Sequence, residues 1–140
     1  MHRIQIFRAL ILIFLLGGSV AGAARAAKVD VYSEFQKKIA KLETDLKKEK
    51  DITKKYDSFL KSYRELSDLR AKNPRQAEEK ELNMSLFMDS LAFLPEKKEF
   101  QAKKCGDYKK EVTTMMQSYS KDQKEPFVER AFKVVDLICK

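Results

Sequence analysis

The sequence predicts an all-α fold: a small bundle of four to five helices with one long or kinked N-terminal helix and one disulfide. Charged residues make up 36% of the chain, and Gly and Pro are scarce, a composition that favours helices. Apolar side chains recur every three or four positions, which is the period of an amphipathic helix. No alternating run of Val, Ile or Thr indicates a β-strand.

The first 26 residues have the pattern of a secretory signal peptide. Arg3 and Arg8 supply a basic start, residues 9–16 are apolar, and Ala24-Arg25-Ala26 is a small-x-small cleavage site. The apolar run is shorter than the ~20 residues that a bilayer-spanning helix needs. We therefore expect residues 1–26 to be a signal peptide and not an anchor.

Cleavage changes the charge and the chemistry of the working protein. We place the cut after Ala26, with Ala23 as second choice and an uncleaved anchor as the alternative. It removes three arginines and no acids, so the formal net charge falls from +8 to +5. It also removes His2, the only histidine, and leaves Gly106 as the only glycine. We expect a periplasmic or secreted protein without a stable membrane span, in which residues 27–140 form a single helical domain.

Cys105 and Cys139 are the only cysteines of the chain. In an exported protein an even number of cysteines predicts a disulfide. Closing this loop would stabilise the fold by roughly 4 kcal/mol in the chain-entropy model. The two residues form no C-x-x-C motif, so a thioredoxin-like role is not expected, and a reactive or intermolecular thiol pair is the alternative.

Residues 30–72 carry two apolar stripes at helical spacing. One helix over about 30–50 and another over 51–72 both fit, but no Gly or Pro separates them. We therefore favour a continuous or kinked long helix over a clean turn, with Glu49 and Thr53 as weak points of its apolar seam. The stripes consist of Val31, Phe35, Ile39, Leu42 and Leu46, followed by Ile52, Tyr56, Phe59, Leu60, Tyr63, Leu66 and Leu69.

Capping residues predict where a third helix begins. Asn73 is a good N-cap, Pro74 suits the first helical position, and Gln76 stands at the capping-box position. The helix should run to about Leu94. Nine of the thirteen residues at 82–94 are apolar, so we expect this stretch to lie inside the core or under a partner.

The rest of the chain predicts two or three more helices. Pro95 begins a fourth helix, which Gly106 breaks or bends. Asp122, with a glutamate three residues later, caps a last helix at 127–138 that is apolar on most faces.

The residues that most enzymes need are missing after cleavage. Without histidine there is no Ser-His-Asp or Cys-His arrangement and no histidine zinc site, and one glycine cannot form a phosphate-binding loop. We therefore expect no enzyme activity, no catalytic residue, no metal and no cofactor. A carboxylate-dependent cell-wall enzyme is an unfavoured alternative. Its candidates Glu78, Glu79 and Glu81 suit the start of a helix, while Glu34 and Glu43 lie on a lysine-rich, solvated face.

Methionine and lysine patterns offer two further binding hypotheses. Met84 and Met88, one helical turn apart, could hold Cu(I), but core packing explains them more simply. Paired lysines could bind a polyanion, yet interspersed acids favour solvated helical faces, and no nucleic-acid partner is expected. The pairs are Lys37-Lys38, Lys47-Lys48, Lys54-Lys55, Lys97-Lys98, Lys103-Lys104 and Lys109-Lys110.

The segment Ile39-Ala40-Lys41-Leu42-Glu43-Thr44-Asp45-Leu46 resembles the Lys/Glu-rich coiled segment of the periplasmic chaperone family of Skp (OmpH). The resemblance covers about residues 28–60 and is mostly compositional. It implies a holdase-type chaperone for unfolded exported proteins. Members of that family trimerise through β-strands, which this sequence does not predict.

The sequence as a whole favours an exported, non-catalytic protein-binding module, such as an inhibitor, an adaptor or a stress-associated factor. Its partner would be another protein in the periplasm or outside the cell. The candidate contact residues are Tyr56, Phe59 and Tyr63, because tyrosine is enriched at interfaces. Ordinary core packing of this stripe is the alternative.

Overall fold

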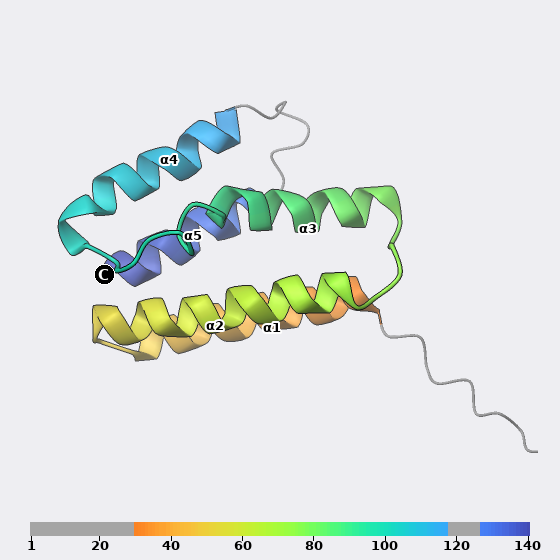
Figure 1. Cartoon of the computed structure of the whole chain (residues 1–140), viewed down its shortest axis with the longest axis horizontal. Coiled ribbons are helices and arrows are strands. Elements are labelled where there is room, and N and C mark those ends of the chain that lie inside the picture. Colours follow the sequence, from red (N-terminus) through yellow and green to blue (C-terminus); the bar gives the residue numbers. More distant parts are fainter. Residues whose placement is uncertain (1–29, 118–126) are drawn as a thin grey trace, which may run out of the picture.

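Helices account for the regular structure of this computed structural model, which describes residues 30–117 and 127–140. α1 and α2 form an antiparallel pair, α5 packs against all four other α-helices, and α4 lies on the side of α5 away from that pair (Figure 1). No strand occurs in the described ranges, and the predicted all-α bundle with one disulfide is confirmed. The elements are α1 (Val31–Lys48), α2 (Ile52–Ala71), α3 (Glu78–Leu91), the 3-10 helix η1 (Ala102–Lys104), α4 (Cys105–Gln117) and α5 (Phe127–Cys139).

The predicted long N-terminal helix is wrong, because residues 49–51 form a sharp connection between α1 and α2. Asp51 caps α2, its carboxylate accepting the N–H of Lys54 at 3.0 Å. The Glu49 carboxylate accepts the N–H groups of Lys50 and Asp51 at 2.8 and 2.9 Å. These side-chain acceptors replace the helical carbonyls that a continuous helix would have offered. The break falls where the apolar seam was weakest.

Both predicted apolar stripes face the interior. The five stripe residues of α1, from Val31 to Leu46, are all at most 2% exposed. In α2, Tyr56, Phe59 and Leu66 are buried, and the other stripe residues pack against the core. The edge of the Phe35 ring meets Phe87 of α3, with 5.9 Å between the ring centres. The hydrophobic periodicity thus identified the faces that α1 and α2 present to α3 and α5.

The third helix begins later than its capping signals predict. α3 starts at Glu78, with Ala77 at the N-cap position and no side-chain cap. Asn73 instead donates its amide N–H to the Leu69 carbonyl at 2.6 Å and so satisfies the end of α2. The N–H of Gln76 donates to the Glu81 carboxylate at 2.8 Å. The residues between 72 and 77 are needed to turn the chain, so the strong Asn-Pro signal marks the end of one helix and not the start of the next.

Pro95 does not start a helix, and Gly106 does not break one. The Tyr56 hydroxyl lies 2.6 Å from the Leu94 carbonyl oxygen and 2.9 Å from that of Lys97, which holds this segment outside a helix. The ring of Phe100 packs between two tyrosines. Gly106 is the second residue of α4 and has no positive φ. Tertiary contacts therefore outweigh the local helix signal.

The last helix is predicted well, and it completes the core. α5 begins at Phe127, and Val128, Ala131, Val134, Val135 and Ile138 are buried at 1% or less. The expected caps at Asp122, Glu125 and Pro126 lie outside the described residues. None of the described helices combines the length and the hydropathy that crossing a membrane requires.

Candidate functional site

The structure places the predicted contact stripe inside the bundle. Tyr56 and Phe59 are 3% and 1% exposed, and Tyr63 is partly buried. The Tyr63 hydroxyl donates to the Met88 carbonyl at 3.2 Å, and burial raises the pKa values of both tyrosines. The three rings follow one another along α2, at 6.2 and 5.7 Å between centres. The three side chains pack in or against the core, which was the alternative interpretation of this stripe. A surface that binds a partner has to be sought elsewhere.

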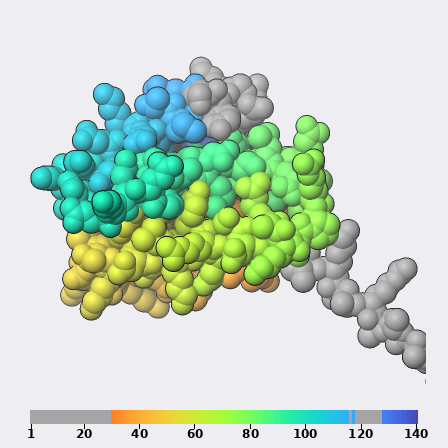
Figure 2. Space-filling view, viewed as in Figure 1, coloured from red at the N-terminus to blue at the C-terminus, as the bar shows by residue number. Residues whose placement is uncertain are grey.

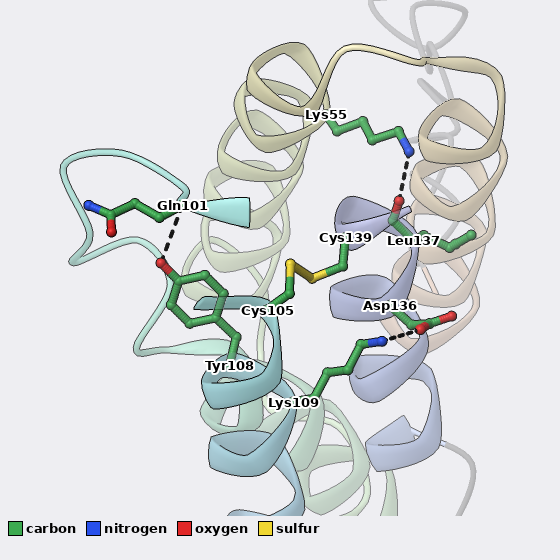
Figure 3. Close-up of a disulfide and its surroundings, with 8 residues drawn as sticks. All are labelled: Lys55, Gln101, Cys105, Tyr108, Lys109, Asp136, Leu137 and Cys139. Carbon is green, nitrogen blue, oxygen red and sulfur yellow. Dashed lines mark hydrogen bonds and ion pairs between the residues drawn. A yellow bond between two sulfur atoms is a disulfide. The ribbon is translucent and has the colours of Figure 1, made fainter. Parts of the chain in front are cut away.

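The disulfide joins the first residue of α4 to the last residue of α5 (Figure 3). The Cα atoms of Cys105 and Cys139 are 5.9 Å apart, a usual span for this bond. One turn further along, Lys109 donates to the Asp136 carboxylate at 2.6 Å. The buried Lys55 of α2 donates to the Leu137 carbonyl at 2.9 Å. The starts of α2 and α4 and the end of α5 therefore meet at one end of the bundle.

Glu43 lies inside an ion triad and not on a solvated face, so that prediction is wrong. Its side chain is 11% exposed and accepts from Arg130 Nε at 2.9 Å and from Lys133 Nζ at 2.8 Å, both on α5. Burial alone would raise the pKa of the Glu43 carboxyl, but the bonds and charges of Lys133 and Arg130 outweigh it and lower the pKa. The triad fixes α5 against α1. The sequence offered only a weak indication that Glu43 is buried, namely that it follows the apolar stripe residue Leu42.

We expect Glu43→Gln to lower the free energy of unfolding by about 1–2 kcal/mol at neutral pH, since Lys133 remains half exposed and screened. A lowered folded-state pKa stabilises the fold above the ordinary titration range of glutamate, and this contribution disappears as the pH falls through the folded pKa. The difference between wild type and variant should therefore shrink as the pH falls below the ordinary titration range of glutamate and vanish below the folded-state pKa. Denaturant unfolding across pH measures it, with Glu34→Gln as control, since the Glu34 side chain is 42% exposed and its only ion-pair partner among the described residues is an exposed lysine on the same helix. A difference that does not change with pH would contradict this role.

A second polar cluster lines the corner between α2 and α3. Arg70 donates from Nη2 to Ser85 Oγ at 2.8 Å, and the same nitrogen lies 3.5 Å from a Glu81 carboxylate oxygen. Arg70 Nε is buried and has no hydrogen-bond partner within the described part of the chain. Two adjoining surface depressions, of about 350 and 590 Å³, share Arg70, Arg75 and Glu81 in their lining. The Arg75 side chain is exposed.

Sequence reasoning missed this corner. The available signal was that two of the four arginines beyond residue 26 flank the Asn73-Pro74 step. The acids Glu78, Glu79 and Glu81 do stand in the first turn of α3, as predicted. There they favour the positive end of the helix dipole.

The methionine hypothesis for copper has no support in the geometry. Met84 and Met88 are 0% and 6% exposed and belong to the hydrophobic core. Within residues 30–117 and 127–140, no three His, Cys, Asp or Glu side chains lie close enough together to hold a metal ion.

Comparison with known proteins returns no relative: no family model, curated protein or solved structure matches this chain.

Proposed function

We propose that this chain is exported and acts by binding another protein through the arginine corner, which we define as Arg70, Arg75 and the depressions that they line. The signal-like first 26 residues and the disulfide both suit an oxidising compartment outside the cytoplasm. The observation that carries the proposal is the pair of arginines in one depression, one of them with an unused buried donor.

The chemistry of arginine supports a partner carboxylate as the group that is bound. A guanidinium presents donors in a fixed fork that matches a carboxylate, and arginine is enriched among residues that dominate interface energies. The present acceptor in the corner is loosely held, because Glu81 lies 3.5 Å from Arg70 and also accepts the N–H of Gln76. A carboxylate from an acidic segment of a partner would meet the exposed Arg75 first and then compete with Glu81 for Arg70.

Two double substitutions test the arginine corner. Affinity purification after crosslinking in the native compartment should recover one dominant partner with the wild type and lose at least 90% of it with Arg70→Gln/Arg75→Gln, because each charge-assisted bond to a carboxylate contributes about 1.5 kcal/mol or more. Lys37→Gln/Arg64→Gln removes the same charge at exposed positions and is the matched control. Arg75→Glu alone, at an exposed position, tests the site without disturbing the partly buried Arg70.

Three outcomes would contradict the proposal. Equal recovery with the arginine variant and the control would show that the corner is not the contact. A broad set of unrelated exported proteins would favour the holdase-type chaperone instead. Partner loss that accompanies a loss of helical circular dichroism in both arginine variants would show that the corner serves folding.

A further inference from the structure

Lysines gather at the end of the bundle where the disulfide lies. The bond between Cys105 and Cys139 and the contact of Lys55 with Leu137 bring the starts of α2 and α4 to the end of α5. The α1–α2 connection lies at the same end, on the left in Figure 1, and the yellow and teal atoms on the left of Figure 2 form this end of the surface. We define the lysine end as the seven exposed side chains of Lys47, Lys48, Lys50, Lys54, Lys103, Lys104 and Lys140.

The acids at the lysine end are mostly engaged with the fold. Glu49 accepts two backbone N–H groups, and Asp51 caps α2. Asp136 is paired with Lys109 and Lys140, while Asp107 is exposed in the first turn of α4. Six of the seven lysines, all but Lys140, form no ion pair with any carboxylate of the described residues. The exposed Glu96 and Glu99, in the segment that Tyr56 binds, are matched by Lys97 and Lys98, so this end keeps an excess of positive charge.

Three of these lysines stand where the helices disfavour them. Lys54 lies in the first turn of α2, a turn without any acidic residue, and Lys103 and Lys104 immediately precede α4. The N-terminus of a helix carries a partial positive charge, so a cation there is repelled. The N-cap Asp51 and the first-turn Asp107 offset part of this repulsion, but none of the three lysines forms an ion pair with a carboxylate of the described residues, which makes them candidates for function.

The opposite end of the bundle has the reverse balance of charge. The starts of α1 and α3 and the end of α2 meet there, with six acids against four basic residues. The molecule is thus polarised along its length. The acids are Asp30, Glu34, Asp68, Glu78, Glu79 and Glu81, and the basic residues are Arg70, Lys72, Arg75 and Lys80.

We propose that the lysine end docks on a membrane surface rich in anionic phospholipids. Lysine acts as a flexible point charge, which suits mobile lipid phosphates better than a bidentate acceptor of fixed geometry. Juxtaposed lysines on separate chain segments add their attractions to such a surface. The opposite end has no such excess of positive charge, so the bundle stands upright on the surface with the lysine end towards the lipid. This inference is independent of the arginine corner, which the upright orientation directs away from the lipid.

Vesicle co-sedimentation tests the docking. The protein is purified from the cells that express it and used without further truncation. The readout is the difference in binding between neutral phosphatidylcholine vesicles and vesicles that also contain about one third phosphatidylglycerol. Lys47→Gln/Lys48→Gln/Lys103→Gln/Lys104→Gln should weaken that difference roughly fivefold for each lysine, about 600-fold in total. Lys37→Gln/Lys61→Gln/Arg64→Gln/Lys72→Gln has the same net charge, changes only exposed positions away from the lysine end, and should retain most of the binding.

The controls separate lipid docking from other causes. Equal weakening by both quadruple variants would overturn the proposal, because only net charge would then matter. Binding that millimolar inorganic phosphate abolishes at constant ionic strength would point to a free-anion site. Tighter binding to duplex DNA than to the vesicles would identify a nucleic acid instead. The Arg70→Gln/Arg75→Gln variant should bind vesicles as the wild type does, so failure of the arginine corner and failure of the lysine end are distinguishable.

Discussion

Replacing both Cys105 and Cys139 with serine is expected to lower the free energy of unfolding by about 4 kcal/mol. The bond closes a loop of sequence separation 34, which removes conformations from the unfolded chain. Its loss should be felt most in α4, because that helix packs mainly on α5 and less on α3. Denaturant unfolding followed by circular dichroism measures the change, with the chemically reduced wild type as the matched control.

Hydrogen exchange locates the effect of the missing bond. Amides of α4 should lose protection first in the serine variant, while those of α1 and α2 keep theirs until global unfolding. Serine variants as stable as the oxidised wild type would show that packing alone holds α4 in place. A reduced wild type much more stable than the serine variant would show that the substitutions themselves, and not the missing bond, cause the loss.

Phe59→Ala is expected to reduce the free energy of unfolding by about 3–5 kcal/mol, the range for deleting a fully buried aromatic side chain. The Phe59 ring is 1% exposed and lies between those of Tyr56 and Tyr63, so its removal leaves a cavity in the core. Lys61→Ala, an exposed position two residues away, is the control and should change stability by less than about 0.5 kcal/mol.

The same variant decides between the two interpretations of the tyrosine stripe. Truncating a core residue lowers the free energy of unfolding. Truncating a contact residue lowers the affinity for the partner and leaves the free energy of unfolding nearly unchanged. Phe59→Ala with normal stability but no partner binding would restore the stripe as a binding surface. We expect the opposite: a destabilised fold whose remaining folded fraction still binds.

Hydrophobic spacing predicted the faces of the helices, but side-chain hydrogen bonds decided where several helices begin and end. The stripe from Val31 to Leu46 and the apolar face of α5 were predictable because burial of many residues at one period is a strong, redundant signal. The α1–α2 break depends on two acids, Glu49 and Asp51, that would also be ordinary inside a helix. The non-helical segment after Pro95 depends on the Tyr56 hydroxyl, which is distant in sequence.

The candidate sites were harder to predict, because they bring together residues from helices that are distant in sequence. Glu43 and Arg130 are 87 positions apart in the sequence, and no local sequence pattern predicts their ion pair. Arg70 and Arg75 are close in sequence, but their shared depression depends on how the chain turns between α2 and α3. The disulfide was predictable, since two cysteines allow one intramolecular pairing.

The packing of α5 against the four other α-helices has a consequence for the order of events during synthesis. Of the described helices, α5 leaves the ribosome last, yet it completes the core and supplies Arg130 and Lys133 to Glu43. In a nascent chain that ends before α5, the apolar faces of the α1–α2 hairpin are not covered by α5. Cys105 has no partner thiol in such a chain. The bundle can therefore close only after α5 has been made, and export of the kind that we propose would meet a chain that is still open.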